Sequence, residues 1–160
     1  MPLLRYLMLL SLIVWLGGLI FFSFGVAPTA FSVLPTRHLA GLVVSRSLTA
    51  LHWIGIVSGI VFLTTSMLYS RLHARSTQPL APRHILLYIM LGLSLISQFV
   101  ISPRMATLRA SMPDTNSVAT TDPVRVQFNA LHAWSTRLEG GVLLLGLVVV
   151  YLTAQQLSGG

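Results

Sequence analysis

Glu139 is the only acidic residue inside an apolar stretch of this chain of 160 residues. It belongs to the segment FNALHAWSTRLEGGVLLLG, residues 128–146, which is uninterruptedly apolar or glycine after Glu139. Ser135 comes about one helical turn earlier and His132 about two turns earlier. A carboxylate and an imidazole at the mouth of a membrane helix can bind a cation, a proton or a polar headgroup. This segment is therefore the first candidate for a binding site.

The composition excludes an ordinary soluble domain. The chain is 54% hydrophobic and 8% charged, whereas soluble domains carry about 25% charged residues. Its net charge of +7 comes from ten arginines and no lysine, against Asp114, Asp122 and Glu139. The arginines stand at the ends of apolar runs and in connections, where they suit lipid phosphates. We therefore expect membrane lipids as partners, and no nucleic acid.

Four apolar runs are long enough to cross a hydrocarbon core of about 30 Å. They cover approximately residues 3–26, 48–69, 84–102 and 138–157. The first is longer than the apolar core of a signal peptide and lacks an A-x-A site, so we expect it to be retained. The sequence predicts one all-α integral membrane domain, a four-transmembrane-helix bundle, in the inner (plasma) membrane of a bacterium.

The second and fourth helices are predicted to extend beyond the bilayer on one face, because their patterns cover about residues 36–71 and 123–156. The dipeptide Ala27-Pro28 is predicted to break the first helix, and Pro103 to end or kink the third. Small residues at helical spacing favour close packing at Gly17, Gly18, Gly55 and Gly59.

An even number of spans places both termini on one face, together with the connection between spans two and three. That connection, residues 71–83, contains three arginines and no acid. The positive-inside rule therefore favours cytoplasmic termini.

Counting residues from the span centres places the polar side chains at different depths. His52 lies roughly 10 Å from the midplane, Glu139 roughly 14 Å and Arg104 roughly 16 Å. His132 lies roughly 24 Å out. The sequence therefore predicts a pocket of His52, Arg104 and Glu139 at the bundle mouth, with His132 and Ser135 above it. In the structural alternative, a Glu139–Arg104 ion pair fastens spans three and four, and His52 donates to a carbonyl.

Non-enzymatic binding or transport of a metal ion or small cation is the first function that this pocket suggests. The chain has no cysteine and no Ser–His–Asp set, paired carboxylates or phosphate-cradling loop. Imidazole, carboxylate and thioether from His52, Glu139 and Met105 are metal ligands. A haem b electron carrier is the alternative, with His52 and His132 as axial ligands, although their depths differ by roughly 13 Å. A third possibility is a structural or assembly subunit of a larger membrane complex. A transporter of this size is expected to be a homo-oligomer, because one copy leaves little room for a translocation path. No cofactor is the first expectation.

The chain resembles the transmembrane-protein-205-like family, a four-span domain of unknown function found in bacteria and eukaryotes. The resemblance rests on four elements: Trp15-x-Gly-Gly18, Val26-Ala-Pro28 with Phe31, Pro103-x-Met105 and Phe128-x-x-Leu-His132-x-x-Ser135. The first of these is also similar to the copper-resistance D family. Animal members are linked to platinum-drug resistance, which implies handling of metals, but the resemblance implies no catalytic residues. Because Asn often follows the last element in the family, Glu139 would be particular to this protein.

Overall fold

The computed structural model describes residues 2–74, 79–112, 118–119 and 121–158. Two short π-helical segments, in which each N–H bonds five residues back, interrupt an otherwise α-helical chain. The elements in order are α1 (Pro2–Phe21), η1 (Phe22–Val26), α2 (Ala27–Val33), α3 (Arg37–Ala74), α4 (Pro82–Ile96), η2 (Ser97–Ile101), α5 (Ser102–Ala110) and α6 (Pro123–Ser158). The described residues contain no strand, so the predicted all-α class is confirmed.

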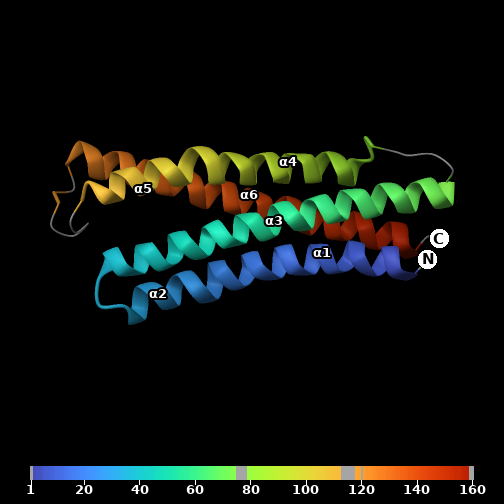
Figure 1. The fold of residues 1–160 in the computed structure, drawn as a ribbon, viewed down its shortest axis with the longest axis horizontal. Helices are drawn as coiled ribbons and strands as arrows, with labels where there is room; N and C mark the ends of the chain where they lie inside the picture. Colours follow the sequence, from blue (N-terminus) through green and yellow to red (C-terminus); the bar gives the residue numbers. More distant parts are fainter. Residues whose placement is uncertain (1, 75–78, 113–117, 120, 159–160) are drawn as a thin grey trace.

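These elements join into four long rods that lie alongside one another (Figure 1). Each rod is long and apolar enough to cross a membrane: Pro2–Val33, Arg37–Leu72, Pro82–Ala110 and Pro123–Gln156. Both termini lie at one end of the bundle, beside the junction of α3 with α4, as the sequence predicts. The α2–α3 and α5–α6 connections lie at the other end, which we call the mouth end.

The outer surface of the bundle is apolar. Large side chains such as Phe21, Ile13 and Leu144 are 69%, 66% and 67% exposed. A water-soluble monomer rarely leaves so much apolar surface uncovered, whereas lipid tails cover it without cost, and helical rods satisfy their backbone hydrogen bonds internally. The protein is therefore an integral membrane protein with four candidate spans.

The first and third rods continue through their prolines, which corrects the predicted break at Ala27-Pro28. Of the two outcomes predicted for Pro103, an end or a kink, the end is wrong. In each case a π-helical segment ends two residues before the proline. The N–H of Ala27 bonds to the carbonyl of Phe22, and that of Ser102 to the carbonyl of Ser97. The wider turn makes room for a proline ring that would otherwise clash with the carbonyl four residues back. The four rods have 32, 36, 29 and 34 residues, so each is longer than the roughly 20 residues that a hydrocarbon core requires.

Close packing of α1 on α3 is centred on Trp15 and two glycines of α3. Trp15 is buried and lies across Gly55 and Gly59, as the predicted packing motif requires. A Cβ atom at Gly55 would come within 2.4 Å of Nε1 of Trp15, and one at Gly59 within 3.0 Å of its Cζ3. At Gly55 any side chain would displace the indole ring, whereas a Cβ at Gly59 would first meet the flexible side chain of Leu91, whose Cδ2 would lie 2.7 Å away.

Of the other two glycines predicted to pack closely, only one does. Gly18 does pack closely, since a Cβ there would lie 3.0 Å from Cδ1 of Leu51. Gly17 faces open space with no atom within 4 Å, so its predicted packing role is wrong. Gly146, which the sequence analysis did not single out, lies against Leu16, whose Cδ2 is 2.3 Å from the position of a Cβ.

Candidate functional site

Glu139 of α6 and His52 of α3 form a pair inside the bundle, in the half nearer the mouth end. Nε2 of His52 lies 2.6 Å from Oε1 of Glu139, and the side chains are 2% and 11% exposed. The depth estimate from sequence predicted that these residues lie close together, and this is confirmed. It is the only ion pair among the described residues.

The π-helical segment η2 supplies the remaining partners of this pair. Ser97 Oγ donates to Oε1 of Glu139 at 3.2 Å, and Nδ1 of His52 lies 2.9 Å from Oε1 of Gln98. Each imidazole nitrogen thus faces an oxygen atom. A doubly protonated His52 can donate one hydrogen bond to each of these oxygens. Three of the four rods are joined at this point by one polar network, so the site is rigid.

Above this pair, a cavity of about 640 Å³ opens at the mouth end. We call it the mouth cavity. Glu139 lines it, and so do polar side chains one and two turns further out on α6, Ser135 and His132. Its apolar wall includes Phe22, Phe24 and Phe31 from the first rod.

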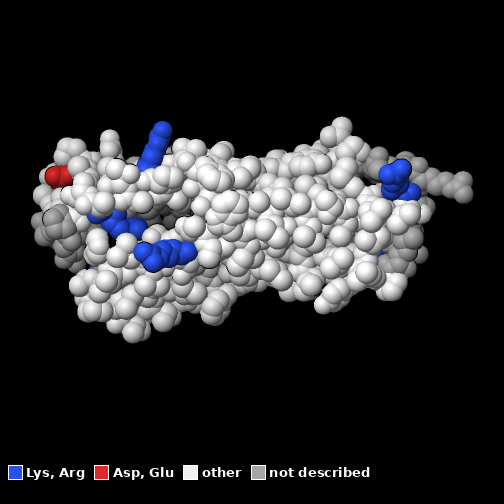
Figure 2. Space-filling model, in the orientation of Figure 1, with Lys and Arg blue, Asp and Glu red and all other residues white. Residues whose placement is uncertain are grey.

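Four arginines line the same cavity: Arg37, Arg46, Arg109 and Arg125. None of them makes an ion pair with a described residue. On the face drawn in Figure 2, basic side chains gather at the mouth end beside a hollow in the surface, while the middle of the bundle carries none. The mouth cavity is therefore positively charged, with one carboxylate that is already paired.

Arg109 is the most buried of these arginines, at 8% exposure. Its Nη1 donates to Oγ of Ser45 at 2.9 Å, and its guanidinium lies 5.4 Å from the ring centroid of Phe128. Arg125 donates from Nη1 to the carbonyl of Val118, and its buried Nε has no hydrogen-bond partner among the described residues. Both guanidinium groups are thus held in place without a neutralising carboxylate from the part of the chain that the structure describes.

The predicted pocket residues separate into three locations. His132, Ser135, Glu139 and Met105 line the mouth cavity, and His52 lies buried beneath Glu139. Arg104 lies elsewhere, in a groove on the outside of the bundle, so the predicted Glu139–Arg104 pair is wrong. Counting residues along the helices predicted that His52 and Glu139 lie close together, but it does not give the direction in which Arg104 leaves its helix.

The residues that the sequence analysis missed have a recognisable spacing. On α6, the positions that line the cavity follow the three-and-four periodicity of one helix face, and Arg125 and Asn129 continue that face outward from His132. On α5, Arg109 falls four residues after Met105 and so shares its face. Helical spacing could therefore have indicated Arg109, Arg125 and Asn129. It could not have indicated that they line one cavity with Arg37 and Arg46 of α3.

The candidate ligands for a metal or haem are poorly arranged. The described residues contain no group of three His, Asp or Glu side chains that could hold a metal ion. Both nitrogens of His52 are already hydrogen-bonded, and the exposed His132 stacks on Phe128 with ring centroids 6.4 Å apart. His52 would have to leave Glu139 or Gln98 before it could bind a metal or haem iron.

Comparison with known proteins identifies the family but supplies no function. Searches of curated proteins and of solved structures find no match for the chain. A family model described as "Domain of unknown function (DUF4149)" matches residues 10–114, from the first rod to the connection after α5. Because this match covers more than half of the 160 residues, the chain belongs to the DUF4149 family.

Proposed function

We propose that this membrane protein binds an anionic amphiphile in the mouth cavity. The observation that carries the proposal is Arg109, whose guanidinium is buried in the cavity wall without a carboxylate partner among the described residues. A buried charge is costly unless an opposite charge or several hydrogen bonds compensate it. An anionic group between Arg109 and Arg46 would supply that compensation.

The shape and lining of the cavity fit a molecule with a charged head and an apolar tail. Its volume of about 640 Å³ is in the usual range for small-molecule sites. Side chains such as Phe22, Leu48 and Leu143 offer an apolar wall beside the arginines. A small inorganic anion would leave this wall without contacts, and a neutral lipid would leave the arginines without counter-charge.

Binding suits the structure better than passage across the membrane. Toward the terminal end, the bundle interior is filled by side chains such as Met8, Leu87 and Val149, each with no exposed surface. The proposal is therefore a non-enzymatic binding protein. We further propose the finer assignments that the sequence suggests, namely membership of the transmembrane-protein-205-like group and a bacterial inner membrane with cytoplasmic termini.

The cation or metal ion suggested by the sequence is the competing candidate. Its support is Glu139, which faces the cavity and has no described hydrogen-bond donor on Oε2. Against it, four arginines surround the same space, and their charge repels a cation. Haem b and a purely assembling role have no such feature in their favour.

Two amphiphiles that share the same alkyl tail but carry headgroups of opposite charge test the proposal. Thermal unfolding of the purified protein in dodecyl maltoside is measured with added dodecyl phosphate or dodecyltrimethylammonium. A ligand that binds only the folded state raises the melting temperature. We expect stabilisation by the phosphate alone, and its loss in Arg109→Gln. If that variant does not fold, Arg46→Gln, at an exposed cavity position, serves instead.

Arg71→Gln is the matched control, because Arg71 is exposed at the opposite end of α3 and touches no part of the cavity. It is expected to respond to dodecyl phosphate as the unmodified protein does. Preferential stabilisation by dodecyltrimethylammonium would favour the cation. Equal stabilisation by both compounds would show that only the tail matters. Either result overturns the proposed ligand.

A further inference from the structure

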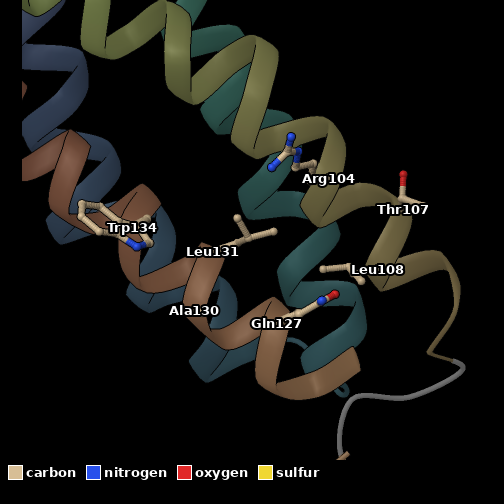
Figure 3. Close-up of a pocket in the computed structure, with 7 residues that line it drawn as sticks. All are labelled: Arg104, Thr107, Leu108, Gln127, Ala130, Leu131 and Trp134. Atoms are coloured by element: carbon tan, nitrogen blue, oxygen red, sulfur yellow. The ribbon is translucent and has the colours of Figure 1, made fainter. Parts of the chain in front are cut away.

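The outside of the bundle carries a second depression, which the mouth cavity does not include. This outer groove, of about 570 Å³, runs between α5 and α6. Figure 3 shows its side chains, with Arg104 of α5 and Leu131 of α6 extending toward each other across it. The lining residues are Arg104, Thr107, Leu108, Gln127, Ala130, Leu131 and Trp134.

The helices α5 and α6 thus form a wall with two different faces. Met105 and Arg109 on α5, and His132 on α6, line the inner cavity. Arg104 on α5, and Gln127 and Trp134 on α6, line the outer groove. No residue is common to both sites, so ligands on the two faces would not compete.

The outer groove offers donors and cations but no acid. The exposed Arg104 has no ion-pair partner among the described residues, and a guanidinium matches the geometry of phosphate oxygens. Gln127 adds an amide that can donate. Arg137 lies over the ring of Trp134, 5.3 Å from its centroid, and brings a second positive charge to the edge of the groove. These features favour a ligand with net negative charge.

Its position relative to the predicted spans points to the membrane surface. Arg104 follows the third span, 84–102, by two residues, and Trp134 precedes the fourth span, 138–157, by four. Tryptophan is enriched at the membrane–water boundary, where its ring lies at headgroup level. One turn deeper than Arg104, Phe99 and Val100 are exposed and apolar. A phosphate at the groove would therefore have its acyl chains beside apolar side chains.

From these observations we infer that the outer groove binds the phosphate of an anionic phospholipid, with phosphatidylglycerol as the class that fits. A zwitterionic headgroup carries the same phosphate but adds a cation, which Arg104 and Arg137 would repel. The inference does not depend on the mouth cavity or its ligand, because it concerns the opposite face of α5 and α6.

Native mass spectrometry of the full chain tests this site. Protein in detergent is mixed with equimolar dioleoyl phosphatidylglycerol and dioleoyl phosphatidylcholine, and the lipid adducts are counted. We expect the phosphatidylglycerol adduct to predominate. Arg104→Gln should lower it by roughly fivefold, the effect of removing one arginine near an anionic headgroup. Arg104→Lys should retain part of it, since charge remains but the forked geometry is lost.

Two controls separate this inference from general basicity and from the proposed function. Arg71→Gln removes an arginine that is also exposed, at the other end of the molecule, and should leave the adduct unchanged. In the Arg109→Gln background, which removes the cavity arginine, Arg104→Gln should still lower the adduct by the same factor, because the two sites share no residue. The inference fails if both lipids bind equally, or if Arg104→Gln weakens phosphatidylglycerol binding no more than Arg71→Gln does.

Discussion

At the scale of single residues, the pairing of His52 with Glu139 is the feature that most constrains this protein. Glu139→Ala would leave a buried imidazole without its counter-charge, and breaking one partner of a buried ion pair costs about 3 kcal/mol or more of stability. We expect the double variant His52→Leu/Glu139→Leu to recover most of this loss, because apolar replacement of a whole pair is often neutral. Unfolding in mixed micelles measures both.

The control for this prediction is Thr136→Ala on the same helix. Thr136 is exposed and its hydroxyl donates only to the carbonyl of His132 within α6. Its removal should change the free energy of unfolding by less than about 0.5 kcal/mol. If the double variant is as unstable as Glu139→Ala alone, the pair has a structural contribution that charge compensation does not explain.

The sequence predicts that His52 and Glu139 lie close together, but it does not predict which side chains form hydrogen bonds with each other. Counting residues along a helix gives depth, and depth placed His52 beside Glu139. The rotation of each side chain around its helix axis also depends on every distortion upstream of it. Arg104 follows the π-helical segment η2, which a regular α-helical count does not include. The direction of its side chain, away from Glu139 and into the outer groove, could therefore not be predicted from sequence.

At the scale of helices, α1 packs closely against α3 because α3 has glycine where Trp15 meets it. Gly55→Ala would place a methyl group 2.4 Å from Nε1 of the buried Trp15. We expect a loss of about 1–3 kcal/mol, the usual cost of overpacking. Gly17→Ala is the matched control, since a Cβ at Gly17 meets no atom within 4 Å. Its stability in the same unfolding assay should change by less than about 1 kcal/mol.

The same comparison tests the correction made to the glycine prediction. Spacing alone favoured packing at both Gly17 and Gly55, because small residues at interfaces and on lipid-facing surfaces look alike in sequence. If Gly17→Ala destabilises the protein as strongly as Gly55→Ala, the contact of Trp15 with α3 is not what makes glycine necessary.

The π-helical segments are the elements that sequence patterns could not predict. The segments FSFGV and SQFVI continue the apolar pattern of their rods without a distinctive residue. Only the prolines two residues later, Pro28 and Pro103, indicate that something changes there, and proline is as compatible with a helix end as with a widened turn. Both segments adjoin the candidate site: η1 lines the mouth cavity and η2 bonds to the buried pair.

At the scale of the whole molecule, the two ends of the bundle differ in their cavities and in the contacts of their arginines. The mouth end holds both of the depressions described above, whereas two arginines at the terminal end donate to neighbouring hydroxyl groups. Arg5 donates to the hydroxyl of Tyr69, and Arg83 donates to Ser66 and Ser70. The four spans and this end-to-end arrangement follow from hydropathy and from the even number of crossings. The mouth cavity could not be predicted from hydropathy, because it depends on how the side chains of four rods pack against one another.

This asymmetry makes orientation decisive for the proposed ligand. With cytoplasmic termini, which the arginine-rich connection between spans two and three favours, the mouth cavity opens on the outer side of the membrane. The absence of cysteine from the chain allows a clean test with single introduced thiols. Val33→Cys at the mouth end and Leu80→Cys at the terminal end are matched, at 73% and 75% exposure. In intact cells, a membrane-impermeant maleimide should label Val33→Cys, and should label Leu80→Cys only after lysis. The reverse pattern would place the cavity on the cytoplasmic side and require its amphiphile to come from the inner leaflet.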